Sequence, residues 1–166
     1  MEAATAPYLA AALLLAAAGV AKTVAPLSLV RALRAAGLRV RAPLLARWVR
    51  LFAAAEAVLG VVAVVRPGPF VAAAVAISYA GFTAFVLRAL RSGSPLASCG
   101  CFGKTDTPPT PGHAIATAAL AVAAVLIAVG PATPLDLPLA VVSGVLAYLT
   151  YLVLAVLPLT SRRALR

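Results

Sequence analysis

Five long apolar stretches, separated by short segments rich in arginine, proline and glycine, constrain the fold of this 166-residue chain more than any other feature. The hydrocarbon core of a bilayer is about 30 Å thick, and an α-helix needs about 20 apolar residues to cross it. The stretches fall at about 7–24, 48–65, 70–90, 113–129 and 137–157. The sequence therefore predicts an all-α fold, a polytopic membrane bundle of four to five transmembrane helices that forms a single domain over 1–166.

The composition supports a membrane protein. Hydrophobic residues make up 64% of the chain and charged residues 11%, with a mean hydropathy of +1.07, whereas soluble domains are about 45–50% apolar and about 25% charged. A net charge of +10 would suit nucleic acid, but the basic residues flank the apolar spans, where they meet lipid head groups. The expected partner is membrane lipid, and nucleic acid is not expected. No basic region precedes the first apolar stretch, so we expect it to be retained as a helix.

The segment between the first two spans is basic and periodic. Val30 and Leu33 are three residues apart, and so are Arg31 and Arg34, which is typical of a short amphipathic helix lying on an anionic leaflet. A plain solvated basic loop is the alternative. The arginines of this segment are Arg31, Arg34, Arg39, Arg41 and Arg47.

Basic residues also predict the topology. With five spans and the N-terminus outside, 13 of the 14 basic residues lie on the cytoplasmic side and only Arg66 faces out. We therefore expect a multi-pass protein of the inner (cytoplasmic) membrane. The same count puts the segment after the third span at the cytoplasmic end, and a miscounted span would move it to the oxidising side.

Two ionisable residues fall within predicted spans. Lys22 is near the inner end of the first span, and Glu56 is about two turns inside the second. An ionisable group inside the bilayer is costly and is a candidate functional residue. The two differ in depth by roughly 9 Å at the helical rise, which two extended side chains can close. In one interpretation Lys22 snorkels to the head groups and Glu56 only pairs with it; in the other Glu56 handles protons during dithiol oxidation.

Both cysteines of the chain lie in the polar segment after the third span, in the sequence Ser98-Cys99-Gly100-Cys101-Phe102-Gly103. Two neighbouring thiols suit two-electron thiol–disulfide exchange. A disulfide between Cys99 and Cys101 would close a very small, strained ring and so be readily reduced. Inert packing is the alternative, because cysteine is often a small buried hydrophobe.

Other residues suggest weaker roles. A closed zinc site needs four ligands. Beyond the thiols the chain has one histidine, His113, and the carboxylates Asp106 and Asp136 combine poorly with thiolates around zinc, so no metal is expected. His113 would lower a cysteine pKa as imidazolium or simply cap the fourth span. Glycines at 60, 81 and 144 mark places where helices can approach closely.

These residues together resemble the MauE family of methylamine-utilisation membrane proteins, in the wider MauE/DoxX group. The matching positions are Gly19-Val20-Ala21-Lys22, Glu56 and Cys99-Gly100-Cys101-Phe102-Gly103. The resemblance implies a small helical membrane protein that helps to mature disulfide-rich periplasmic proteins, with the small subunit of methylamine dehydrogenase as the namesake client. It implies a redox role for Cys99 and Cys101 and a structural or proton-handling role for Lys22 and Glu56. The chain departs from the family at 112–114, where Gly-His-Ala replaces an Arg-Asn pattern.

The leading hypothesis is a membrane thiol–disulfide oxidoreductase that passes electrons to or from a thioredoxin-like partner with its own Cys pair. The chain has only two cysteines, so the partner must supply the second pair. A non-enzymatic scaffold or chaperone subunit, with a structural or metal-binding Cys pair, is the second hypothesis. A quinone-linked redox subunit is the third, resting on Glu56 and the tyrosines; apart from such a quinone, no cofactor is expected.

Overall fold

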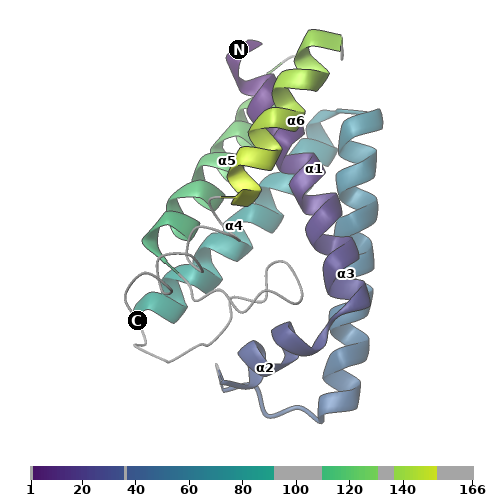
Figure 1. Ribbon diagram of the computed structural model, residues 1–166, viewed down its shortest axis with the longest axis vertical. Coiled ribbons are helices and arrows are strands. Elements are labelled where there is room, and N and C mark those ends of the chain that lie inside the picture. The colour runs from purple at the N-terminus through teal and green to yellow at the C-terminus, as the bar shows by residue number, and fades with distance from the viewer. Residues whose placement is uncertain (1, 36, 92–109, 131–136, 153–166) are drawn as a thin grey trace.

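A computed structural model describes residues 2–35, 37–91, 110–130 and 137–152, and every regular element in these ranges is a helix. Figure 1 shows their arrangement. The helices are α1 (Glu2–Val24), α2 (Leu27–Ala35), α3 (Ala42–Val65), α4 (Pro69–Arg91), α5 (Pro111–Val129) and α6 (Leu137–Tyr151). The two cysteines, Cys99 and Cys101, lie outside the described residues.

Four of these helices are long and apolar enough to cross a membrane: Ala4–Val24, Ala42–Val65, Pro69–Arg91 and Pro111–Val129. The predicted all-α polytopic bundle is therefore confirmed. The fifth expected span begins at Leu137 as predicted, but only 15 residues of it are described as helix α6. Helix α3 begins six residues before the expected position. Pro43 is compatible with the first turn, because backbone N–H groups there make no hydrogen bond within the helix and the lack of one in proline costs nothing.

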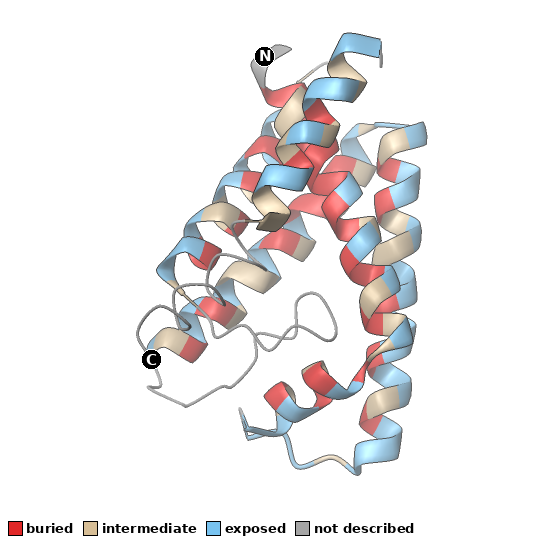
Figure 2. Ribbon diagram, in the orientation of Figure 1, coloured by how far each residue is buried: buried red, intermediate tan, exposed pale blue. Residues whose placement is uncertain are grey.

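Helix α1 lies at the centre of the bundle. It packs against α3, α4, α5 and α6, and 61% of its most apolar window is buried, against 22–39% in the other three long helices. Figure 2 shows buried residues following α1, while the neighbouring helices turn exposed faces outward. These outer faces carry large apolar side chains such as Val61, Ile77 and Ile115, which lipid tails solvate well.

The contact between α1 and α3 is a backbone contact. A Cβ atom at Gly19 would lie 2.5 Å from the Ala57 nitrogen and 2.6 Å from the Ala53 oxygen. A Cβ atom at Gly60 would lie 2.5 Å from the Ala16 nitrogen and 2.6 Å from the Ala12 oxygen. Each helix supplies two alanines and a glycine at the same spacing, so the antiparallel helices interlock reciprocally. The two backbones touch because no side chain longer than a methyl group separates them.

Only one of the three glycines expected at close helix contacts behaves as predicted. Gly60 does, as described above, but an added Cβ atom would meet nothing within 4 Å at Gly81 or Gly144. Within the described chain, therefore, neither glycine is required by a close approach at its Cβ position. Gly19, which sequence reasoning did not single out for packing, is the second close contact.

Helix α2 is the short amphipathic helix that the sequence predicted, so the alternative of a plain loop is wrong. Val30 and Ala32 are buried, whereas Arg31 and Arg34 are exposed. Val30 packs with Leu45 and Val49 of α3, and Ala32 packs against Ala89 of α4. This helix thus connects two parts of the bundle that otherwise diverge toward this end (Figure 1).

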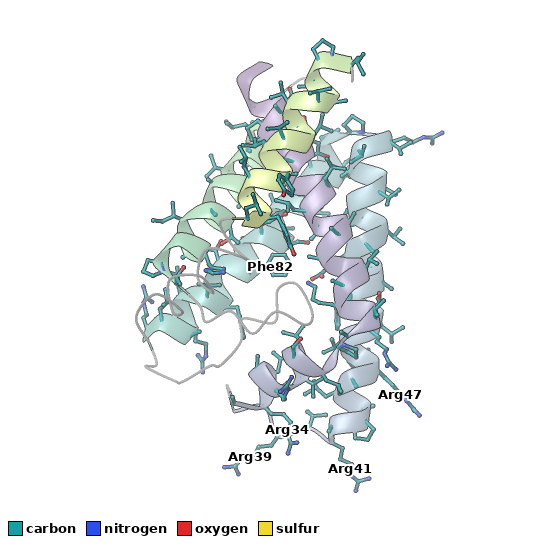
Figure 3. The ribbon with its side chains drawn as sticks, in the orientation of Figure 1. Arg34, Arg39, Arg41, Arg47 and Phe82 are labelled. Carbon is teal, nitrogen blue, oxygen red and sulfur yellow. The ribbon has the colours of Figure 1, made fainter. Side chains whose placement is uncertain are left out.

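Basic side chains gather at the α2 end of the molecule. Figure 3 labels Arg34, Arg39, Arg41 and Arg47 there, and Arg66 directly follows the opposite end of α3. The described residues thus have the charge asymmetry on which the topology prediction rests. The side of the membrane that this end faces stays a prediction.

We predict that substitution at Gly60 destabilises the bundle whereas the same substitution at Gly81 does not. Gly60→Ala forces the α1 and α3 backbones apart, and overpacking of this kind costs about 1–3 kcal/mol. Gly81→Ala is the matched control, because it meets open space and raises helix propensity by about 1 kcal/mol. The measurement is the midpoint of thermal unfolding in detergent. Equal midpoints for the two variants would contradict the close crossing.

We also predict that the turn before α4 lies outside the cell and the start of α3 inside. In a chain with both native cysteines changed to serine, Gly68→Cys should react with a membrane-impermeant maleimide on intact cells. Ala42→Cys, at an exposed position at the start of α3, should react only after the membrane is opened. The reverse pattern would invert the topology.

Candidate functional site

Lys22 and Glu56 form an ion pair between α1 and α3, with Lys22 Nζ donating to Glu56 Oε2. The glycine contacts place them: Lys22 is one turn beyond Gly19, and Glu56 is one turn before Gly60. The Lys22 side chain is only 4% exposed and that of Glu56 is 21% exposed. The interpretation in which Lys22 snorkels to the head groups is therefore wrong, while the pairing expected from the sequence is present.

A third helix completes the surroundings of Lys22. Its ammonium nitrogen lies 4.7 Å from the centre of the Phe82 ring of α4, within the range of a cation–π interaction. Phe82 meets Tyr79 edge to face, with ring centres 5.7 Å apart, and the Tyr79 hydroxyl donates to the Ala11 oxygen of α1 at 2.8 Å. Sequence reasoning missed Phe82 and Tyr79, because hydrophobic periodicity does not tell which aromatic ring faces a cation.

The energetic balance of this site depends on both charges being present. Each ion loses solvation when it is buried, and the attraction between the two offsets that loss only while both remain. The Phe82 ring adds attraction on one side of Lys22 but does not replace a carboxylate. The pair therefore fixes the relative position of α1 and α3 as well as offering a polar group within an apolar bundle.

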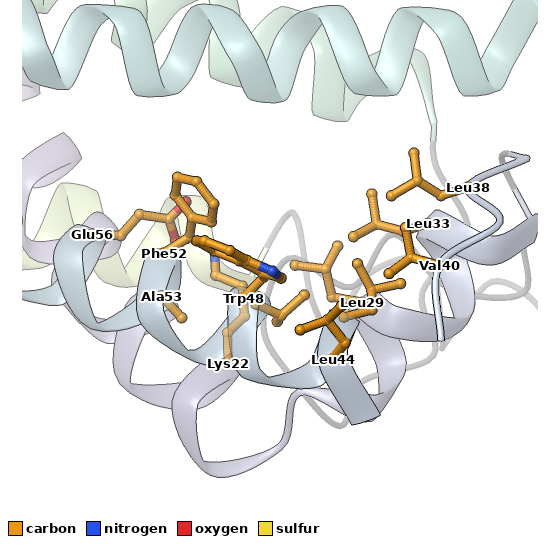
Figure 4. Close-up of a pocket in the computed structure, with 12 residues that line it drawn as sticks. Lys22, Leu29, Leu33, Leu38, Val40, Leu44, Trp48, Phe52, Ala53 and Glu56 are labelled. Atoms are coloured by element: carbon orange, nitrogen blue, oxygen red, sulfur yellow. The ribbon is translucent and has the colours of Figure 1, made fainter. Parts of the chain in front are cut away.

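A cavity of about 490 Å³ opens beside the ion pair. Figure 4 shows Glu56 and Phe52 at one end and Leu33, Leu38 and Val40 at the other. Among the described residues of its wall, Lys22 and Glu56 are the only charged ones, and the others come from α2, α3 and the connection between them. The lining consists of Lys22, Leu29, Leu33, Leu38, Val40, Leu44, Leu45, Trp48, Val49, Phe52, Ala53 and Glu56.

His113 lies in the first turn of α5 and is part of a polar cluster. Its Nδ1 lies 2.7 Å from the Thr110 hydroxyl, which also accepts a bond from the His113 backbone N–H. The Thr117 hydroxyl donates to the His113 oxygen at 2.8 Å and lies 2.9 Å from the Thr83 hydroxyl of α4. The cap of α5 is thus Thr110, with His113 as its hydrogen-bond partner rather than the capping residue. Thr83 joins α4 to α5.

The predicted redox residues, Cys99 and Cys101, belong to segment 92–109 and lie outside the described residues. The described chain leaves off at Arg91, the last residue of α4, and resumes at Thr110, before α5. Within the described ranges, no group of three His, Cys, Asp or Glu residues is suitably placed to hold a metal ion.

The fold and this site define a multi-pass helical membrane protein with a buried Lys–Glu pair beside an apolar cavity. Residues 2–132 match the family model of methylamine utilisation protein MauE, so the chain belongs to the MauE family. The matched range contains Lys22, Glu56, Cys99 and Cys101. No curated protein and no solved structure matches the chain.

We predict that removing either charge of the ion pair destabilises the protein more than removing both. Glu56→Gln and Lys22→Met each leave one buried charge without its partner, at a cost of about 3–5 kcal/mol. The double variant leaves no charge and should recover most of that loss. Thermal unfolding midpoints of the four proteins, measured in one detergent, give the coupling energy. Additive losses in the double variant would show that the two residues do not depend on each other.

Proposed function

We propose that this MauE-family protein is a membrane thiol–disulfide redox protein that serves the maturation of disulfide-containing extracytoplasmic proteins. The observation that carries the proposal is the Cys99-Gly100-Cys101 sequence, which holds the only two cysteines of the chain and falls within the range matched by the family. Such closely spaced thiols are the minimum requirement for two-electron exchange. The membrane of action that we propose is the inner (cytoplasmic) membrane.

The proposed exchange proceeds through a mixed disulfide. A thiolate of the pair attacks a disulfide sulfur of a thioredoxin-like partner, and one partner thiolate leaves. The second thiolate of the pair then attacks the mixed disulfide, forms the Cys99–Cys101 disulfide and releases the second partner thiolate. Two electrons pass to the partner and two protons leave the thiols. The reverse sequence returns the pair to the dithiol with electrons from the partner.

The Lys22–Glu56 pair is assigned to proton handling in this scheme. Glu56 is partly exposed to the cavity, and its carboxylate is an acceptor that proton transfer requires. Segment 92–109 is joined to α4 at Arg91, and nearby Ala89 packs against α2, which lines the cavity. This proximity of the α4 end to the cavity wall supports the assignment. Arg88 and Arg91, in the last turn of α4, would favour by their charge a thiolate that approached them.

We predict that changing the resolving cysteine to serine traps a covalent complex with the partner. The first thiolate still attacks, but the mixed disulfide has no second thiol to release it. One of the two single variants, Cys99→Ser or Cys101→Ser, should give a reductant-sensitive band of higher mass on non-reducing electrophoresis of membranes. The double variant, which should still form the helical bundle, is the matched control and should give none.

The same experiment separates the redox function from a scaffold function. If neither single variant traps a partner and the double variant still supports client maturation, the thiols are dispensable and the redox proposal fails. A membrane scaffold or chaperone subunit would then explain the data. If Glu56→Gln folds and still supports full turnover, the proton-handling assignment fails while the thiol exchange stands.

A further inference from the structure

The cavity beside the ion pair has the dimensions of a ligand site. Its wall follows α3 from Leu44 to Glu56, which corresponds to about 18 Å along the helix axis. Its volume of about 490 Å³ is within the range of about 300–1,000 Å³ that is usual for small-molecule pockets. Apolar side chains line most of this length, and polar groups converge at one end only (Figure 4). A ligand that fits such a wall has a hydrocarbon body and a single polar end.

The charges at the polar end select an uncharged head group. Lys22 and Glu56 already neutralise each other, and among the described residues they are the only charged ones in the wall. An anionic or cationic head group would add a charge without a partner inside the bundle, which is costly. Fatty acids and anionic phospholipids therefore match this end poorly, although the cavity would accept their tails.

The hydrogen-bonding groups of the ion pair limit further which head groups can bind. Glu56 uses one carboxylate oxygen, Oε2, for Lys22, and Oε1 has no hydrogen-bond partner among the described residues. A carboxylate only accepts hydrogen bonds, whereas the Lys22 ammonium has three donors. The head group must therefore donate to Glu56 and accept from Lys22. A hydroxyl group does both with one oxygen.

Aromatic rings next to the ion pair indicate that the hydroxyl is carried by a ring. Trp48 and Phe52 lie side by side on α3, with ring centres 6.4 Å apart and planes inclined by 36°. Both line the cavity, and both are more than half exposed. A planar ring placed between them and the ion pair would cover this surface and make offset ring contacts.

We propose that the cavity binds an uncharged, lipid-soluble hydroxy-aromatic compound, the chemical class to which hydroquinones with a hydrocarbon tail belong. The ring hydroxyl lies between Glu56 Oε1 and Lys22 Nζ, the ring contacts Trp48 and Phe52, and the tail follows the leucines of α2. The binding needs neither cysteine, so it stands or falls independently of the thiol exchange.

Trp48 is the only tryptophan of the chain and reports directly on the cavity. The experiment uses the full-length protein with Cys99→Ser and Cys101→Ser, in nanodiscs of zwitterionic lipid. An alkylhydroquinone, kept reduced under inert gas, is titrated while the Trp48 fluorescence is followed. Its dimethyl ether is the matched control ligand, since it has the same ring and tail but no hydrogen to donate. We expect a saturable change with the hydroquinone and at least about tenfold weaker binding of the ether.

Three variants place the binding in this cavity. Leu33→Phe fills the apolar wall and should abolish the saturable change, whereas Val122→Phe, on an exposed face of α5, should leave it unchanged. Glu56→Gln should bring the affinities of hydroquinone and ether closer together. A linear response, equal affinity for the two ligands, or indifference to Leu33→Phe would overturn the proposal. So would a saturable change produced by anionic phospholipid and unaffected by hydroquinone, which would make the cavity a phospholipid site.

Discussion

The backbone contact between α1 and α3 is the constraint on which the other features depend. Gly19 and Gly60 let two antiparallel helices touch without intervening side chains. The contact sets the relative register of the helices, and this register brings Lys22 to Glu56 although 34 residues separate them. The cavity follows from the same arrangement, because α2 must return from the end of α1 and pack its apolar face on the start of α3. A wider crossing would leave the two charges apart, each of them buried without a partner.

Hydropathy and charge predicted much of this structure. The four long spans, the amphipathic α2 and the pairing of Lys22 with Glu56 follow from apolar length, arginine spacing and the cost of a buried charge. The early start of α3 was missed, because Arg47 interrupts the apolar pattern although the helix continues through it. The reciprocal spacing of Ala12, Ala16 and Gly19 with Ala53, Ala57 and Gly60 was also missed. Alanine is so frequent in this chain that spacing alone does not distinguish a contact face from a lipid face.

The rest of the candidate site could not be predicted from the sequence, because it depends on which faces of the helices pack against one another. Nothing in the spacing of Phe82 or Tyr79 shows that one ring lies under Lys22 and the other hydrogen-bonds α1. Gly81 and Gly144 resemble Gly60 in sequence, but an added Cβ atom at either would meet nothing within 4 Å in the described chain. The cavity is formed by α2, α3 and the end of α1 together, so no single segment carries its signature. The Cys-Gly-Cys sequence is the opposite case, since its chemistry is evident from the residues alone.

The central position of α1 has a consequence for biogenesis. Helices enter the membrane in the order of synthesis, yet α1, which is made before the other described helices, is the most deeply buried of the four long ones. Helix α1 can pack against α3 early, but its faces that contact α5 and α6 remain uncovered until those helices have been made. Lys22, in contrast, lacks a carboxylate partner only until α3, which carries Glu56, has been made. The α1–α3 hairpin is therefore the earliest unit in which both charges are neutralised, and the later helices assemble around it.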